Sequence, residues 1–592
     1  MLVLCWWRMW GLLKGCAFGV VASVVFSILP AFGAEPSDKS SVEGVLQNTE
    51  QRLEANDKQK ALDHSYLPAG VTGEGAPASD QGGDRFFLKK VRIVGAETLS
   101  SAALQACARS YVGRSVVLSE LPKLSDCMTN LYTDAGYSLS RVIVPPQDVT
   151  GGVLTLQAIE GYVAAFEVEG DPAEQFPVAA YVQVLMQERP LRQKSLERQL
   201  MLLNDVPGLA LEDTAFEEIT ELSGAFKLVL KVKTWRAWMH SEMDNRGSDA
   251  VGPVQSYQSV FLNSPFGRGA SVGVSYSSIP DASDELNFGR VTVDVPLNVD
   301  GLVLSGFVSG SETRPSDERE LDDTRYRSLK GGVSLTWAAL RQRDLSVWLG
   351  TGLWASHKTY EDVTGRFVRD ELRGVQVNGR FDFIDRFEGD NSLYVSLRQG
   401  LDVAGASREG DGNLSNDDGD GVFTKFYLDY ARYQKLDENW SLKVDAALQL
   451  ASDDLLSSEE FYIGGSRFGR GFESGVLSGD SGAGFGAELA YHREFDLAFI
   501  NGATLFGFVD GAGILEDGDH DAEGAFVVSA GGGVRLFLDY NFTAEFEMAF
   551  ALEDDYLADV DDHEFFFRLS RSVKLDELNL ASFVKSTPFG RP

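Results

Sequence analysis

Residues 392–401 read SLYVSLRQGL, and they show the pattern that decides the fold of this chain. Apolar residues alternate there with polar or small ones, which is the two-residue period of a strand with one apolar face. From residue 235 to residue 573, segments of about ten residues repeat this alternation, as in SLKVDAALQL at 441–450. We count about 16 such segments, which predicts an all-β transmembrane barrel of about 16 antiparallel strands with a water-filled lumen.

The connections between these segments are of two kinds. Short ones, such as NVDG at 298–301 and QKLDEN at 434–439, alternate strictly with long acidic ones, such as 310–325 and 405–421. A barrel that places one end in the periplasm and the other outside the cell sorts its connections in this way. A soluble β-sandwich is the alternative, and it would not separate short from long connections so regularly.

The N-terminus carries the one long apolar run of the sequence. Arg8 and Lys14 precede a central apolar segment that ends in small residues around Ala31 and Gly33. This pattern predicts a secretory signal peptide over 1–33, with a signal anchor as the alternative. No later segment has the run of about 18 apolar residues that a transmembrane helix needs. We therefore expect an exported protein without a helical membrane span.

The net charge limits the kinds of partner that the protein can bind, and the cysteine content bears on whether a disulfide forms. The net charge is −35, and removal of residues 1–33 takes away two positive charges and no negative ones, which leaves −37. So acidic a protein is a poor partner for nucleic acid. Cys5 and Cys16 leave with the signal, so Cys107 and Cys127 remain. An exported compartment permits a disulfide between them, and two buried free thiols are the alternative.

Residues 86–161 and 162–234 follow one plan twice. Each segment runs strand, helix, helix, strand, strand over about 75 residues, which is a repeat signal. The two helices of the first segment hold Cys107 and Cys127, and a helix of the second reads SLERQLMLLNDVPG at 195–208. We predict two small α/β modules in tandem ahead of the barrel.

Polar segments flank these modules and the barrel. An N-terminal helix is expected within 34–63, followed over 64–85 by a linker rich in Gly, Pro, Ser and Asp. The helix has too few apolar residues for a core of its own, so it either docks elsewhere or moves freely. At the other end of the chain, residues 574–592 form a C-terminal extension beyond the last alternating segment.

Four motifs carry a resemblance to a known family. They are RVIVPPQDVTGGVLTLQAIEGYV (141–163), the helix at 195–208, EMDNRGSDAVGP (242–253) and IGGSRFGRGF (463–472). In this order they resemble the outer-membrane transporters of two-partner secretion, of the haemolysin secretion/activation type, within the superfamily of outer-membrane insertases. The resemblance implies that the two modules are POTRA domains in the periplasm of a Gram-negative cell. The extension past the last strand departs from the usual end of such barrels.

The resemblance also implies a role for the glycine-rich stretch. In this family the loop between the eleventh and twelfth strands folds into the lumen, where its arginine pairs with an aspartate of the wall. The matching residues are Gly464, Gly465, Gly469, Arg470, Gly471 and Phe472 in the loop and Asp510 on the wall. Glycines let a loop pass close to a wall, and a shielded lumen strengthens an arginine–carboxylate pair. Gly469 stands where Val or Ile is usual, and Ala512 where the aspartate motif has glycine.

No constellation for catalysis or metal binding emerges from the sequence. Gly269, Ser271 and Gly273 match a nucleophile-elbow pattern, but they lie within an alternating segment. Residues 416–421 resemble the start of a calcium loop, yet Tyr427 occupies the position that requires Glu. Weak divalent-cation binding by the acidic loops is the alternative to a solvated charged surface. We expect a protein that is not an enzyme and has no cofactor and no metal site.

Two functions remain after these exclusions. The first is an outer-membrane pore that recognises an unfolded partner protein on its POTRA domains and translocates it to the cell surface. The second is an assembly factor that inserts other barrels, although such factors more often carry three or more POTRA units. A plain porin would leave the POTRA modules unexplained. The expected partners are an unfolded cargo and outer-membrane lipid, and the expected state is a monomer. The N-terminal helix is a candidate plug, and the sequence leaves open whether it blocks the pore.

Overall fold

The computed structural model describes residues 40–58, 85–170, 176–280, 282, 284–515, 525–553 and 563–575. The expected signal peptide at 1–33 lies outside the described residues, as do nearly all of the linker at 64–85 and the extension from 576 onward.

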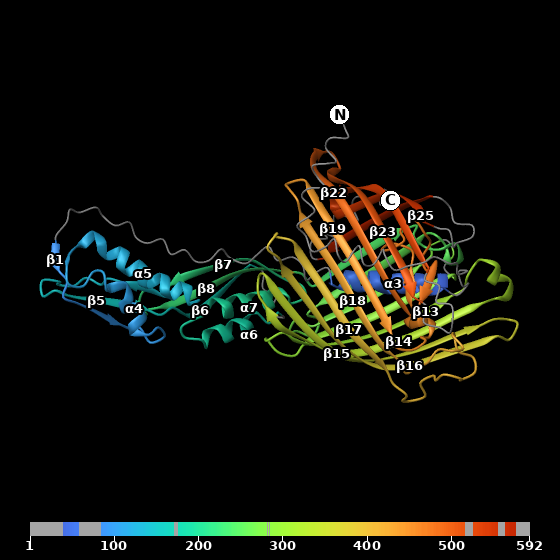
Figure 1. The fold of residues 1–592 in the computed structure, drawn as a ribbon, viewed down its shortest axis with the longest axis horizontal. Helices are drawn as coiled ribbons and strands as arrows, with labels where there is room; N and C mark the ends of the chain where they lie inside the picture. Colours follow the sequence, from blue (N-terminus) through green and yellow to red (C-terminus); the bar gives the residue numbers. More distant parts are fainter. Residues whose placement is uncertain are drawn as a thin grey trace, which may run out of the picture.

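A closed barrel of sixteen strands forms the larger part of the molecule (Figure 1). The first strand, β9 (Ala237–Asp244), pairs with the second, β10 (Gln255–Asn263), and also with the last, β26 (His563–Lys574), which closes the sheet. Every pair of neighbouring strands is antiparallel. The predicted barrel and its strand number are confirmed.

The other strands of the barrel are β11 Ser271–Ser278, β12 Leu286–Pro296, β13 Leu302–Thr313, β14 Arg325–Arg341, β15 Leu345–Glu361, β16 Phe367–Ile384, β17 Asp390–Gly400, β18 Thr424–Lys435, β19 Trp440–Ala451, β22 Ser481–Leu497, β23 Ile500–Leu515, β24 Phe526–Leu538 and β25 Phe542–Glu553.

Strand β14 shows how the sequence pattern is used. Leu329, Val333, Leu335 and Trp337 lie on its exposed face, whereas Lys330 on the other face reaches into the lumen. Because successive side chains of a strand point to opposite sides, the alternation in the sequence gives an apolar outer surface and a polar interior.

The first α/β module packs its two helices on a three-stranded sheet with the order β2-β5-β4. Its buried core includes Leu104, Leu124, Met128 and Leu156. Its elements are β1 Arg85–Phe87, β2 Lys90–Val94, α4 Ser101–Ala108, β3 Ser115–Val117, η3 Leu118–Glu120, α5 Leu121–Asp134, β4 Arg141–Ile143 and β5 Val153–Ile159.

The second module repeats this plan with a sheet in the order β6-β8-β7. Its elements are β6 Tyr162–Gly170, α6 Val178–Met186, α7 Gln193–Asn204, β7 Leu209–Glu218 and β8 Ala225–Thr234. Its apolar core continues into the barrel, where Ala338 joins the buried cluster. Arg341 of β14 holds Asp205, which follows α7, through Nε and Nη2 at 2.8 and 2.7 Å. The second module is therefore fixed to the periplasmic mouth of the barrel.

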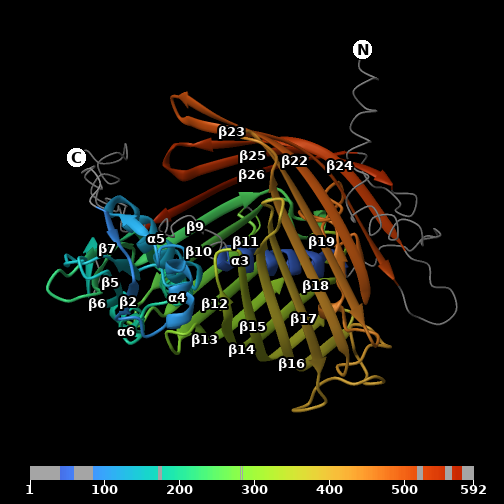
Figure 2. The same ribbon diagram turned by 60° about the vertical axis from the view of Figure 1, so that its left-hand side comes forward.

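Helix α3 (Ser40–Lys58) lies inside the barrel (Figures 1 and 2). Val42, Val45 and Leu46 are buried in one cluster with residues of the inner wall, among them Phe288 and Tyr326. The N-terminal helix, which has too few apolar residues for a core of its own, thus buries them against the inner wall of the barrel. Among the described residues, no helix has the length and apolar character needed to cross a membrane.

Candidate functional site

The loop between β19 and β22, residues 452–480, is folded into the lumen. It joins the eleventh and twelfth strands of the barrel, and it carries a small antiparallel pair, β20 (Phe461–Ile463) and β21 (Leu477–Gly479). Phe468 and Phe472 belong to a buried apolar cluster that also contains residues of the inner wall. We call this segment the lumen loop. It is a packed element whose apolar side chains share a core with the inner wall of the barrel.

Asp510, on the inner face of β23, holds the tip of the lumen loop. Its Oδ1 accepts hydrogen bonds from the backbone amides of Gly469 and Arg470, at 2.6 and 3.2 Å, and from Ser529 Oγ at 2.7 Å. The side chain is 3% exposed. A buried carboxylate needs such donors, and here the backbone of the loop supplies two of them.

The Arg470 side chain binds different carboxylates from the one expected. Its guanidinium pairs with Glu488 of β22, at 3.1 Å from Nη1, and with Glu547 of β25. It also lies over the ring of Phe508, 3.6 Å from the centroid. The expected pairing of this guanidinium with Asp510 is therefore replaced by backbone contacts to Asp510. Asp510 Oδ1 accepts the backbone and serine donors and Oδ2 receives no hydrogen bond from the described residues, because the long arginine side chain passes over Phe508 and reaches the carboxylates of β22 and β25.

The glycines of the motif are required for two different steric reasons. Gly464, Gly465 and Gly469 have φ values of +103°, +87° and +74°, which residues with a Cβ rarely adopt. A Cβ at Gly471 would lie 2.8 Å from the backbone carbon of Phe550. The first three glycines turn the chain, and the fourth lets it touch the wall. Phe472, 1% exposed, anchors the same segment.

Charged residues that the sequence analysis missed complete this site. Arg246 donates from Nη2 to Glu547 at 2.6 Å and from Nη1 to the Gly465 carbonyl at 3.4 Å. Arg535 pairs with Glu488 at 2.6 Å. The signal for Glu488, Arg535 and Glu547 was available, because each of them stands on the polar face of an alternating segment. Arg246 instead lies in the connection between β9 and β10. Their mutual contacts depend on strands that are distant in the sequence.

Helix α3 is held beside the lumen loop by polar contacts. Glu50 pairs with Lys330 at 2.9 Å, Glu43 pairs with Lys358, and Arg52 pairs with Asp244. The amide of Asn48 donates to Ser474 of the lumen loop, and a Cβ on Gly44 would overlap the backbone of Gly475. The helix and the loop therefore fill the lumen together. Of the described residues, no group of three or more His, Cys, Asp and Glu side chains could hold a metal ion.

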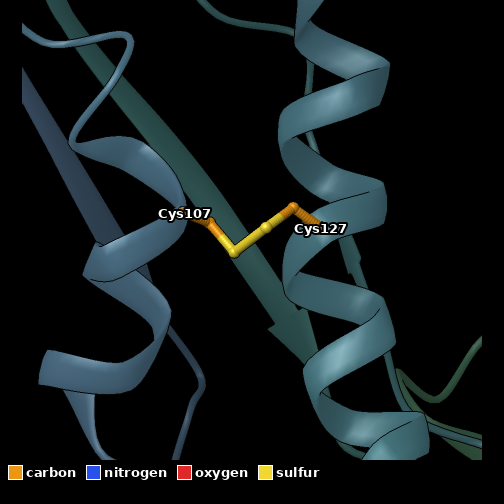
Figure 3. Close-up of a disulfide and its surroundings, with 2 residues drawn as sticks. All are labelled: Cys107 and Cys127. Carbon is orange, nitrogen blue, oxygen red and sulfur yellow. A yellow bond between two sulfur atoms is a disulfide. The ribbon is translucent and has the colours of Figure 1, made fainter.

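The two expected disulfide cysteines lie far from the lumen, in the first module. Cys107 on α4 and Cys127 on α5 are joined by a disulfide, with their Cα atoms 6.0 Å apart (Figure 3). The bond ties the two helices that cover one face of the sheet, so it supports the module internally.

A hydrogen-bonded carboxylate closes the same module at the junction with the second. Glu160 accepts bonds from the amides of Glu97 and Thr98 and from the hydroxyls of Thr98 and Tyr132, at 2.8–2.9 Å. Partial burial alone would raise the pKa of Glu160, but these donors outweigh it and lower the pKa below its usual value. Burial and the bond to Glu160 raise the pKa of Tyr132.

Comparison with known proteins follows the same division of the chain. Residues 86–161 match the model of the ShlB-type POTRA domain, and residues 224–536 match that of the haemolysin secretion/activation proteins ShlB/FhaC/HecB. The outer membrane transporter CdiB of Escherichia coli is 24% identical over 511 residues, which cover 83% of this chain and 82% of the relative. The heme/hemopexin transporter protein HuxB of Haemophilus influenzae (strain 86-028NP) is 21% identical over 388 residues, covering 63% and 66%.

Solved structures show the same fold. CdiB from Escherichia coli superposes with a TM-score of 0.69 at 21% identity, covering 92% of this chain and all of that one. CdiB from Acinetobacter baumannii gives a TM-score of 0.63 at 16% identity, covering 91% and 100%. The family model spans more than half of the chain. The chain belongs to the haemolysin secretion/activation protein family ShlB/FhaC/HecB, and it is a two-partner secretion transporter of the outer membrane with POTRA domains in the periplasm.

Proposed function

We propose that this transporter captures an unfolded partner protein on its POTRA domains and passes it through the barrel after helix α3 has left the lumen. The contents of the lumen carry this proposal. Helix α3 and the lumen loop lie side by side there, and side-chain contacts connect the helix to the wall and to the loop. A polypeptide needs the space that the helix takes up.

Capture requires a surface that accepts an extended chain. Strands β2 and β4 are the edges of the first POTRA sheet, and β6 and β7 are the edges of the second. An unfolded segment can add a strand to such an edge, where main-chain hydrogen bonds give affinity and side-chain pockets give register. Because no ATP is available in the periplasm, binding of this ordinary kind has to supply the recognition.

We infer that the protein works by binding and conduction without catalysing a reaction or carrying a cofactor. A single copy forms the pore, because all sixteen strands close within one chain. Outer-membrane lipid covers the apolar face of the barrel.

Locking the helix in place tests the proposal. Asn48 and Ser474 touch across the helix–loop contact, so an Asn48→Cys/Ser474→Cys variant places two thiols there. We expect oxidised cells to secrete at least about tenfold less partner protein than reduced cells, and the Asn48→Cys single variant to secrete normally under both conditions. Secretion that continues with the cross-link formed would show that the helix need not move.

A deletion tests capture separately. Removing residues 162–234 should abolish binding of the N-terminal domain of the partner, which is sought as the product of a neighbouring gene. An isolated barrel that binds this domain with the affinity of the full chain would contradict capture by the POTRA domains. Levels of other outer-membrane proteins should stay constant in both experiments; if they fall, the chain acts as an assembly factor.

A further inference from the structure

An arginine-rich cluster lies on the outside of the barrel, at the end away from the POTRA domains. It consists of Glu312, Arg314, Arg325, Arg327 and Glu361, from the adjoining ends of β13, β14 and β15. We call it the rim cluster. The POTRA domains contact the opposite end of β14 through Arg341, so the rim cluster is at the extracellular end.

The alternation along β14 shows that the rim cluster faces the membrane. Leu329, Val333, Leu335 and Trp337 are exposed on the outer face, and Arg327 and Arg325 continue the same odd-numbered series. The eight steps from Trp337 to Leu329 cover about 27 Å along the strand. At the tilt usual for such barrels this corresponds to roughly 20 Å across the membrane, close to the height of the apolar band. The two arginines therefore stand where the acyl region ends and the headgroups of the outer leaflet begin.

Ion pairs hold the arginine side chains in place. Arg327 lies 3.1 Å from Glu361 and 3.4 Å from Glu312, and Arg314 lies 3.0 Å from Glu312. Arg325 lies 3.4 Å from Glu312. The side chain of Arg327 is still 47% exposed and that of Arg314 is 39% exposed. A guanidinium carries five N–H donors, so a carboxylate partner orients each arginine and leaves donors for a second anion.

A groove runs from the rim cluster over the neighbouring strands. It has a volume of about 660 Å³, and its lining combines Arg327 and Glu312 with Tyr276, Leu329 and Phe367. Leu329 lies on the membrane side of Arg327 on the same face of β14, whereas Phe367 is level with Glu361. An apolar side chain below the arginine suits a molecule that has acyl chains below and an anion above. The three arginines outnumber the two glutamates in a chain whose net charge is −35, so this patch is positive against an acidic background.

We propose that the rim cluster and its groove bind a phosphorylated glycolipid of the outer leaflet, with the arginines on its phosphate groups and the groove along its acyl chains. Arginine binds phosphate through paired, charge-assisted hydrogen bonds. The occupant is a lipid and not the transported polypeptide, because the cluster lies on the outside of the closed wall and the partner passes through the inside. The bound lipid fixes the height of this side of the barrel in the membrane.

Binding of lipid A to the purified full-length protein in detergent tests the proposal. Two forms of the lipid with the same acyl chains are compared, one with both phosphates and one without phosphate. The rim variant is Arg314→Gln/Arg325→Gln/Arg327→Gln. The matched control, Arg386→Gln/Arg432→Gln/Arg571→Gln, removes the same charge from the periplasmic end. Folding of each variant is checked by its heat-modifiable migration.

We expect the wild type and the control variant to bind phosphorylated lipid A at least about tenfold more tightly than the phosphate-free form. The rim variant should bind both forms equally weakly. Equal binding of the two lipids by the wild type would overturn the proposal, and this comparison needs no variant to fold. An unchanged affinity in the rim variant, or an equal loss in the control variant, would overturn it as well.

Discussion

Helix α3 and the lumen loop occupy the same lumen, yet they are held there in different ways. The loop enters and leaves through strands β19 and β22, packs Phe468 and Phe472 into an apolar cluster, and binds Asp510 with its backbone. The helix is connected to the wall by ion pairs and one small apolar cluster. The charged groups of such pairs are hydrated again once the helix leaves, whereas withdrawal of the loop would expose its apolar cluster to water. The comparison indicates a removable helix beside a permanent loop.

Changing a turn glycine of the lumen loop should have the largest effect on secretion. In Gly464→Val the backbone of the valine must keep a φ of +103°, and its Cβ overlaps the Glu473 carbonyl oxygen. The backbone strain alone costs on the order of 1–3 kcal/mol, so the loop should leave its position and secretion should be lost. Gly412→Val is the matched control, because a Cβ there meets open space. Secretion is measured together with barrel abundance. Normal secretion from Gly464→Val would show that the loop need not hold this shape.

Removing Arg470 from the lumen loop should have the second-largest effect on secretion. Arg470→Ala leaves Glu488 and Glu547 without this partner, at a cost of about 1–3 kcal/mol. The strand ladder is unaffected, so the barrel should reach the outer membrane while secretion falls about tenfold. Asp510→Ala, which removes the acceptor of the loop backbone, should have a similar effect. Arg467→Ala, in the same loop and paired with Asp429, whose side chain is 29% exposed, is the control.

Undiminished secretion in both Arg470→Ala and Asp510→Ala would exclude a role of these contacts in transport. A loss of the barrel itself would mean that they serve assembly.

Breaking the ion pair between Arg52 of helix α3 and Asp244 of the wall should change the opening of the idle pore more than it changes secretion. Arg52→Ala removes the partner of Asp244, whose side chain is fully buried, and the helix should leave the lumen more often. We expect the time that single channels spend open in planar bilayers to rise several-fold, with secretion nearly unchanged. Gln51→Ala, at an exposed position of the same helix, should behave as the wild type. Unaltered conductance in Arg52→Ala would mean that the helix does not block the pore.

The smallest effect is expected where helix and loop touch. In Gly44→Ala the added methyl group overlaps the Gly475 backbone, although alanine favours the helix by about 1 kcal/mol. The two contributions oppose each other, so open time should rise by less than in Arg52→Ala. The same bilayer recordings measure it. An increase larger than that of Arg52→Ala would show that the contact with the loop, and not the ion pair with the wall, holds the helix.

Local rules were sufficient for much of this architecture. The alternation along β14 and its equivalents predicted a barrel of about 16 strands, and sixteen are present. The Cys107–Cys127 pair was proposed from export and chain position, and the structure joins these cysteines. The partner of the Arg470 guanidinium was not predictable in the same way. Glu488 and Glu547 are 18 and 77 residues away, and nothing local distinguishes them from Asp510.

By itself, the sequence determined the order of the α/β modules and the barrel, the number of strands and the motif of the lumen loop, and it predicts an export signal that lies outside the described residues. These depend on composition and on a two-residue period, which each segment carries alone. The tertiary structure alone decided how deep the loop sits, which carboxylates face Arg470, and where helix α3 finds its apolar contacts. It also decided that Arg314, Arg325 and Arg327 meet at one point of the outer rim. Closing the barrel sets the relative height of all strands, and that height determines which side chains become neighbours.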